Sequence, residues 1–223
     1  MDVKINHTGG GSAAPVPRVH CDYTAESAPR RLQQLVADGL FHNLQSSGPE
    51  AAISDEEIER LVSGRFAFVN VWRSIDREQP VLQMPLAVCD ERTVSFCCNS
   101  NDQPFRQPPC VCVVATCHRL IGITDATGGW GGQVREQDKF KYELVFPDRV
   151  GENYSLDART SSAHGWYYYP AMTTEECLVF KVYDKQECGP RFVFHTAFDD
   201  PSSAVDAPPR TSIEVRMVVF FDD

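Results

Sequence analysis

The 223-residue sequence lacks several features that define whole classes of protein. Basic residues are outnumbered, with 21 Lys and Arg against 31 Asp and Glu, and the formal net charge is −10. This balance argues against nucleic acid and anionic membranes as partners, because both attract basic surfaces. No apolar run approaches the ~18 residues of a membrane span, and Met1–Pro15 contains no apolar core of signal-peptide length. We therefore expect a cytoplasmic protein.

The sequence contains nine cysteines, an odd number. Without a secretion signal, reduced thiols are the expected state. The segment Thr93–Gln133 holds five of them, together with His118. A zinc site built on Cys110, Cys112 and Cys117 is one interpretation, but the usual spacing of zinc ligands is absent. The alternative is an atypical, poorly structured insertion, because a loop this long is unusual in a compact domain.

Two helices are expected early in the chain. Ala25–Leu44 carries leucines and a valine on one face, as an amphipathic helix does, and Thr24 or Ser27 is placed to cap it. Ser54 opens a second, shorter helix with the pattern of a capping box, and Gly64 ends it.

Short strands make up the rest of the predicted secondary structure. Runs rich in β-branched and aromatic residues, bounded by turn residues, indicate strands. They fall at Val3–His7, Phe66–Arg73, Pro85–Cys89, Tyr142–Phe146, Asn153–Leu156, Trp166–Tyr169, Leu178–Tyr183, Arg191–Phe194 and Ser212–Phe221. So many short strands predict an all-β sandwich or barrel with the helices packed outside, and a ligand site at the barrel mouth.

The best candidate metal ligands are two histidines and an aspartate. His20 and Asp22 are two residues apart, so in an extended segment both side chains project from the same face. His195, at the end of the expected strand Arg191–Phe194, would complete a set of two histidines and one carboxylate. This ligand set leaves coordination positions open and is typical of non-haem Fe(II) oxygenases. The alternative is a surface His-x-Asp and a structural histidine in an ordinary β fold.

A carboxylate-binding arginine is expected close to that metal. Arg210 and Ser212 stand at the start of the last strand, which we expect to lie beside the His195 strand. A guanidinium grips a carboxylate through two parallel hydrogen bonds. Arg216 lies six residues further on with the same parity and is a second candidate for the pocket. Arg210 is favoured because it begins the strand at the expected metal end.

Four further residues are candidate pocket residues, each with a structural alternative. Asn70 faces the same way as large apolar neighbours, and a buried amide needs a polar partner. It is therefore either a pocket group or one half of a structural hydrogen bond. Trp72, Trp166 and Tyr167 could line the substrate space, although large aromatic side chains more often belong to the core.

Several motifs taken together resemble a known family. FAFVNVWR, PLAVCD, LVFPDRVGENYSL, HGWYYYPAM, FKVYD and HTAFDDP followed by APPRTSIEVRMVVFF are similar to the fungal and bacterial hydroxylase/desaturase family. That family includes the cephalosporin methoxylase-associated protein and gibberellin desaturase-like enzymes. The resemblance covers most of residues 3–24, 66–92 and 142–221. It implies a mainly β, double-stranded β-helix core of the jelly-roll or cupin-like type, with a few flanking helices.

The resemblance also implies an activity and roles for particular residues. Members look like oxygenases that use Fe(II), 2-oxoglutarate and dioxygen to hydroxylate or desaturate small-molecule secondary metabolites. By this resemblance His20, Asp22 and His195 are the iron ligands. Arg210, supported by Ser212, binds the distal carboxylate of 2-oxoglutarate. The alternative is a catalytically inactive, truncated member that binds only metal or ligand.

The chain departs from the family pattern in two places. The metal motif already occurs at residue 20, so we expect the family's amino-terminal segment to be missing. Residues 93–133 replace what is usually a short connection. We therefore expect residues 1–223 to form a single oxygenase-like domain with an atypical insertion.

Overall fold

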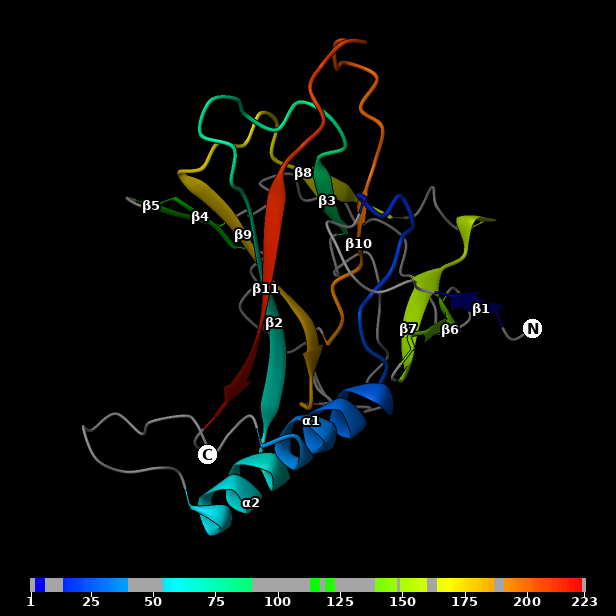
Figure 1. Cartoon of the computed structure of the whole chain (residues 1–223), viewed down its shortest axis with the longest axis vertical. Helices are drawn as coiled ribbons and strands as arrows, with labels where there is room; N and C mark the ends of the chain where they lie inside the picture. The colour runs from blue at the N-terminus through cyan, green and yellow to red at the C-terminus, as the bar shows by residue number, and fades with distance from the viewer. Residues whose placement is uncertain are drawn as a thin grey trace, which may run out of the picture.

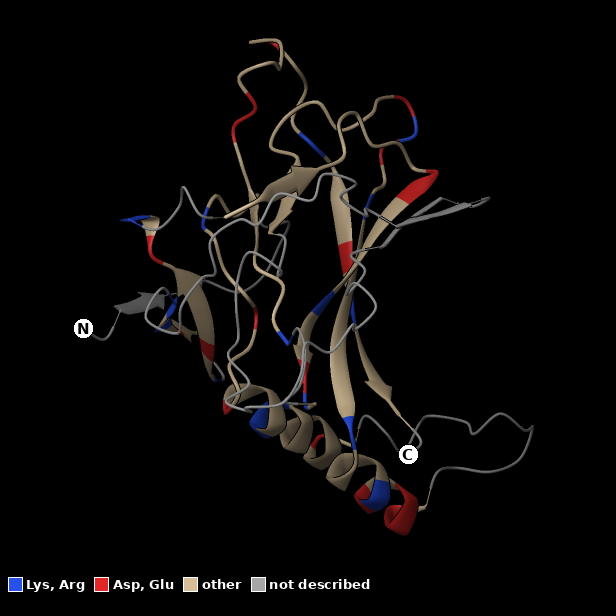
Figure 2. Ribbon diagram, turned by 180° about the vertical axis from the view of Figure 1, so that it is seen from behind, with Lys and Arg blue, Asp and Glu red and all other residues tan. Residues whose placement is uncertain are grey.

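The structure is a computed structural model that describes residues 3–6, 14–39, 54–89, 113–116, 119–122, 139–147, 149–159, 164–186 and 191–221. Two helices, α1 (Ser27–Ala37) and α2 (Asp55–Ser63), lie nearly end to end below the strands in Figure 1. The acidic first turn of α2 marks its outer end in Figure 2. Negative charge at this position stabilises a helix, because the amino-terminal end of the helix dipole is positive.

The strands of the described residues form three sheets. They are β1 (Val3–Asn6), β2 (Phe66–Ser74), β3 (Leu86–Cys89), β4 (Val113–Thr116), β5 (Arg119–Gly122), β6 (Lys139–Val145), β7 (Val150–Leu156), β8 (Trp166–Tyr168), β9 (Glu176–Asp184), β10 (His195–Ala197) and β11 (Ser212–Phe220). The strand orders are β1-β6-β7, β10-β3-β8 and β11-β2-β9-β4-β5. Only the β1–β6 pair is parallel among these strands. The predicted mainly β fold is confirmed.

The core is built from alternating side chains, as period-2 strands require. On β9, Leu178, Phe180 and Val182 are buried, while the residues between them are only half-buried. From β2, Phe68 contributes to the same core, and Leu32 of α1 is fully buried against it. Burial of each of these apolar side chains stabilises the fold by roughly 1.5–3 kcal/mol, because apolar surface is removed from water. The strands on either side of the core therefore hold a fixed register.

Both helices begin near the predicted residues. Ser54 caps α2, with its Oγ accepting from the Glu57 N–H at 3.2 Å, and α2 ends before Gly64 as predicted. Thr24 Oγ1 accepts from the Ser27 N–H at 3.0 Å at the start of α1. The prediction that α1 continues to Leu44 is wrong: it ends at Ala37, because Gly39 adopts a φ of 72°, a left-handed conformation that stops helices.

The expected arrangement of the last strands is wrong in two respects. Arg191–Phe194 is not a strand; the strand is β10, and His195 begins it rather than following it. β10 and β11 are not neighbours, because β10 pairs with β3 and β11 pairs with β2. Between them, Pro208 and Pro209 lack the backbone N–H groups that would continue a ladder, so the chain crosses to the other sheet.

Part of the 93–133 segment has a defined backbone. β4 and β5 form an antiparallel pair, and β4 also pairs with β9. The expectation of an atypical, poorly structured insertion stays a prediction for the rest of the segment. The cysteines and His118 that suggested zinc lie outside the described residues.

Candidate metal centre

Backbone pairing places His20 and Asp22 between two sheets. His20 and His195 form an antiparallel bridge, with N–H to O distances of 3.0 and 2.9 Å. The next residue, Cys21, bridges in the same way to Tyr154 of β7. Its thiol turns the other way and donates to the Val182 carbonyl at 3.0 Å. The extended backbone therefore directs the side chains of His20 and Asp22 to the same side, as the His-x-Asp spacing predicts.

The three predicted ligands come together in one cluster. The potential ligand atoms of His20, Asp22 and His195 all lie within 4.8 Å of one another. The Nε2 atoms of His20 and His195 are 3.7 and 3.9 Å from Asp22 Oδ1. Two ligand atoms with bonds of about 2.1 Å to one ion are separated by at most about 4.2 Å. Both histidine–aspartate pairs satisfy this limit.

Hydrogen bonds fix the orientation of both imidazole rings. Nδ1 of His20 lies 2.7 Å from the Arg18 carbonyl oxygen, and Nδ1 of His195 lies 3.2 Å from that of Val193. A carbonyl can only accept, so each Nδ1 carries the hydrogen and each Nε2 keeps its lone pair. Metal-binding histidines are oriented in this way, with the second ring nitrogen donating to a backbone carbonyl.

The cluster is in the protonation state that a divalent cation requires. Burial, reinforced by the neighbouring His195, lowers the pKa of His20 to about 4. Burial likewise lowers the pKa of His195. Burial alone would raise the pKa of Asp22, but Arg216 and the two histidines hold it well below its usual range. At neutral pH the set is therefore two neutral imidazoles and one carboxylate.

Two side chains from neighbouring strands contact the carboxylate. Asn70 of β2 donates from Nδ2 to Asp22 Oδ2 at 2.7 Å. Arg216 of β11 donates from Nη2 to Oδ1 at 3.3 Å and from Nε to Glu214 Oε1 at 2.9 Å. Asn70 and Arg216 are direct partners in the β11–β2 ladder. The structure thus places both beside the cluster of His20, Asp22 and His195.

Glu214 is the residue that sequence reasoning missed. A single glutamate in a strand belongs to no motif, but it shares the parity of Arg210, Ser212 and Arg216. Burial raises its pKa, and the nearby Asp22 carboxylate adds to the effect. The alternation of side chains along β11 puts Glu214 on the same side as Arg216, and this alternation could have identified it.

Arg210 is half-buried and has the same parity as Glu214 and Arg216 of β11. Its guanidinium lies over the Trp72 ring, 5.1 Å from the centroid, and Nη1 donates to the Met84 carbonyl. Its Nε is buried without a hydrogen-bond partner, and no carboxylate pairs with it among the described residues. Ser212, two residues on, is half-buried opposite Ser74. Trp72, itself 3% exposed, therefore supports Arg210.

Strand register separates the two aromatic candidates of β8. Tyr167 pairs with Val88 of β3, which pairs with His195 of β10. Directly paired residues project from the same face of a sheet, so Tyr167 shares the face of His195. Trp166 pairs with Cys89 on the opposite face and packs against the hydrophobic core.

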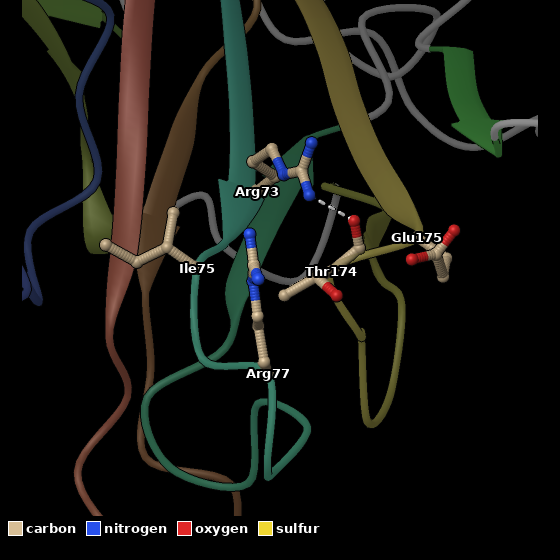
Figure 3. A pocket seen from close by; sticks show the side chains of 5 residues that line it. All are labelled: Arg73, Ile75, Arg77, Thr174 and Glu175. Carbon is tan, nitrogen blue, oxygen red and sulfur yellow. Dashed lines mark hydrogen bonds between the residues drawn. The ribbon is translucent and has the colours of Figure 1, made fainter.

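An open hollow of about 530 Å³ lies elsewhere on the surface. Figure 3 shows its lining and the hydrogen bond from Arg73 to the Thr174 carbonyl. Arg73 has the opposite parity to Asn70 and Trp72 on β2, so it faces away from the metal cluster. The lining residues are Arg73, Ile75, Arg77, Thr174 and Glu175.

The fold and the site define a double-stranded β-helix protein that carries a two-histidine, one-carboxylate cluster between its sheets. The chain belongs to the family described as oxidoreductase/YMDC permease-like domain, whose model matches residues 2–101 and 131–220. Within the described residues, neither helix has the length and apolar character needed to cross a membrane.

Curated fungal proteins are similar to most of this chain. Aspirochlorine biosynthesis protein N of Aspergillus oryzae is 31% identical over 75% of this chain and 53% of its own length. Hydroxylase/desaturase CTB9 of Cercospora beticola is 27% identical over 92% and 47%. The Fe(II)/2-oxoglutarate-dependent dioxygenase nvfI of Aspergillus novofumigatus is 27% identical over 97% and 56%. The resemblance to hydroxylase/desaturases is confirmed, and the chain spans about half the length of these relatives.

A solved structure supports the fold. The iron and alpha-ketoglutarate-dependent endoperoxidase NvfI superposes with a TM-score of 0.58 and 25% identity, covering 92% of this chain and 54% of that chain. The predicted jelly-roll class is therefore confirmed.

Proposed function

We propose that this chain is the core of an Fe(II)/2-oxoglutarate-dependent oxygenase that hydroxylates or desaturates a small-molecule secondary metabolite. The observation that carries the proposal is the convergence of His20, Asp22 and His195, with the two Nε2 atoms 3.7 and 3.9 Å from one carboxylate oxygen. The names of the similar proteins, which include an iron-dependent dioxygenase and hydroxylase/desaturases, support the same chemistry.

The donor set fits Fe(II). His20 Nε2, His195 Nε2 and Asp22 Oδ1 would hold the ion and leave further coordination positions open. With 2-oxoglutarate and dioxygen, bound iron supplies the oxidising power to remove hydrogen from an unactivated carbon. The residues around it exclude water from the ligands, because Asp22 and His195 are both buried.

Arg210 is the proposed partner of the distal carboxylate of 2-oxoglutarate, with Ser212 beside it. Arg210 has a buried Nε without a partner and no acidic neighbour in ion-pair contact among the described residues. Arg216, by contrast, is already paired with Asp22 and Glu214. A guanidinium that lies over an aromatic ring and is not in an ion pair is the better receptor for a ligand carboxylate.

The proposed substrate space lies on the His195 face of the β10-β3-β8 sheet. Tyr167 projects from this face and is the aromatic residue proposed to contact substrate. Trp166 and Trp72 take structural roles instead, in the core and under Arg210 respectively.

We also propose that residues 1–223 form one oxygenase-like domain interrupted by an insertion. The family model leaves residues 102–130 unmatched, which supports this division. A cytoplasmic location and the absence of nucleic-acid and membrane partners stay predictions from charge and composition.

Release of succinate from 2-oxoglutarate tests the proposed function. The purified chain, given Fe(II) and 2-oxoglutarate, is expected to release succinate in an oxygen-dependent manner. His20→Ala and Asp22→Ala should lower this rate at least 100-fold, because each removes a proposed ligand. Arg77→Ala, in the distant surface hollow, serves as the control and should leave the rate unchanged. Equal release by wild type and both ligand variants would rule out the proposal, whereas Fe(II) binding without any turnover would favour a binding-only protein.

A further inference from the structure

Asn70 is the most deeply buried polar contact of the metal cluster. It lies in the middle of β2, which is paired on both sides, to Arg216 of β11 and to Phe180 of β9. Its side chain is fully buried, and its Nδ2 donates to Asp22 Oδ2 at 2.7 Å. An amide held by two ladders has little freedom to move, so the position of its donor is fixed.

The chemistry of the pair fixes the orientation of the amide. An ionised carboxylate can only accept hydrogen bonds, so the amide nitrogen must face Asp22 and the amide oxygen must face away. The oxygen, Oδ1, is buried without a hydrogen-bond partner among the described residues. A buried unpaired carbonyl costs stability. A leucine of similar size would avoid this cost, so the asparagine is better explained by its effect on Asp22 than by packing.

The two oxygens of Asp22 have different surroundings. Oδ2 is occupied by the rigid Asn70, whereas Oδ1 faces the histidines at 3.7 and 3.9 Å. The other contact of Oδ1 is Arg216, whose side chain is 52% exposed and therefore much freer to move aside. The buried amide thus holds Oδ2, whereas the contact to Oδ1 comes from a long, partly exposed side chain that an ion could displace.

We propose that Asn70 is a positioning residue that assigns Oδ1 of Asp22 to the metal and keeps Oδ2 from binding it. The inference rests on the proposed function, because it requires a divalent ion between His20, Asp22 and His195. Without the amide donor, Oδ2 becomes free, the carboxylate can turn, and one-oxygen coordination is no longer enforced. Partners of metal ligands typically change affinity 10–100-fold when removed.

Cobalt(II) binding to the full chain tests this role, since its visible absorption reports the number and arrangement of ligands. Asn70→Leu should weaken Co(II) binding about 10–100-fold and change the absorption bands of the bound ion. Asn153→Leu is the matched control: it removes another buried asparagine, on β7, and should leave both the Kd and the bands unchanged. A merely structural role for Asn70 would lower the melting temperature without changing the bands.

The outcomes separate the two proposals. A wild-type chain that binds no Co(II) would overturn the proposed metal centre and this inference with it. Wild-type binding with an unchanged Kd and unchanged bands in Asn70→Leu would overturn only the role of Asn70. If circular dichroism shows that Asn70→Leu does not fold, Asn70→Ser is measured instead. A serine hydroxyl is too short to take the place of the amide donor, so the same loss of Co(II) affinity is expected.

Discussion

Arg216 and Asp22 form an ion pair at the metal cluster, with Nη2 lying 3.3 Å from Oδ1, the oxygen that also faces both histidines. Under the proposed function, the guanidinium would therefore compete with a bound cation for the same oxygen. It also explains how a buried carboxylate stays ionised, since Arg216 is the main influence that lowers the pKa of Asp22 against the effect of burial. Arg216 thus has two opposing effects: it keeps Asp22 ionised, as a metal ligand must be, and its positive charge disfavours a cation at the same oxygen.

Replacing Arg216 should strengthen metal binding. In Arg216→Met the competing positive charge is gone, while Glu214 remains close by. We expect the Kd for Mn(II) to fall about 3–10-fold at low ionic strength, with a smaller effect at high salt, because the side chain is partly exposed and screened. Titration calorimetry measures the change. Weaker binding in this variant would show that Arg216 organises the ligands rather than competing with the ion.

Arg210 should control the affinity for 2-oxoglutarate but not for metal. Arg210→Met removes the proposed carboxylate partner, and we expect the 2-oxoglutarate concentration for half-maximal succinate release to rise at least 10-fold. The Mn(II) Kd should stay within twofold. Arg73→Met, on the outer face of β2, is the control for loss of an arginine. If Arg216→Met rather than Arg210→Met raises the 2-oxoglutarate requirement, the assignment of the two arginines is reversed.

Asp184 should make the fold sensitive to acid. Its buried carboxylate accepts from Arg65 Nη2 at 3.0 Å and from Lys181 Nζ at 2.9 Å. Burial would raise its pKa, but these hydrogen bonds outweigh burial and lower it. Because the folded-state pKa is the lower one, the stabilisation is present above the unfolded value near 3.9 and is lost as pH falls below it.

Asp184→Asn should therefore cost about 3 kcal/mol of unfolding free energy at pH 7 and less as the pH approaches 3. Urea unfolding at several pH values measures this. Glu57→Gln removes a carboxylate from the exposed pair with Arg60 and should leave the unfolding free energy almost unchanged. A pH-independent difference between wild type and Asp184→Asn would refute the electrostatic explanation.

The ligand cluster was predictable because its signals are local. His20 and Asp22 follow from a two-residue spacing on extended backbone, and His195 was chosen as a histidine at the end of an expected strand. The placement of Arg210 and His195 on neighbouring strands was wrong, since adjacency in sequence suggested a hairpin. The chain instead crosses between sheets, which depends on tertiary packing that no local pattern records.

The surroundings of Asp22 could be predicted only in part. Asn70 was recognised as needing a partner, but its partner lies 48 residues away in the chain, on a segment that pairs with other sheets, so the packing of the sheets brings the two side chains together. Glu214 carried no motif at all. Tyr167 and Trp166 looked equivalent in the sequence, whereas the pairing of β8 with β3 sends them to opposite faces. The pairing and packing of strands that are distant in the sequence are thus the information that the sequence pattern did not supply.

A crystal structure of the chain with Mn(II) and 2-oxoglutarate tests the metal centre most directly, because manganese has an anomalous signal that locates it. The ion should lie about 2.0–2.3 Å from His20 Nε2, His195 Nε2 and Asp22 Oδ1, with the distal carboxylate of 2-oxoglutarate on Arg210. An anomalous peak at any other set of side chains, or none between His20 and His195, would contradict the account.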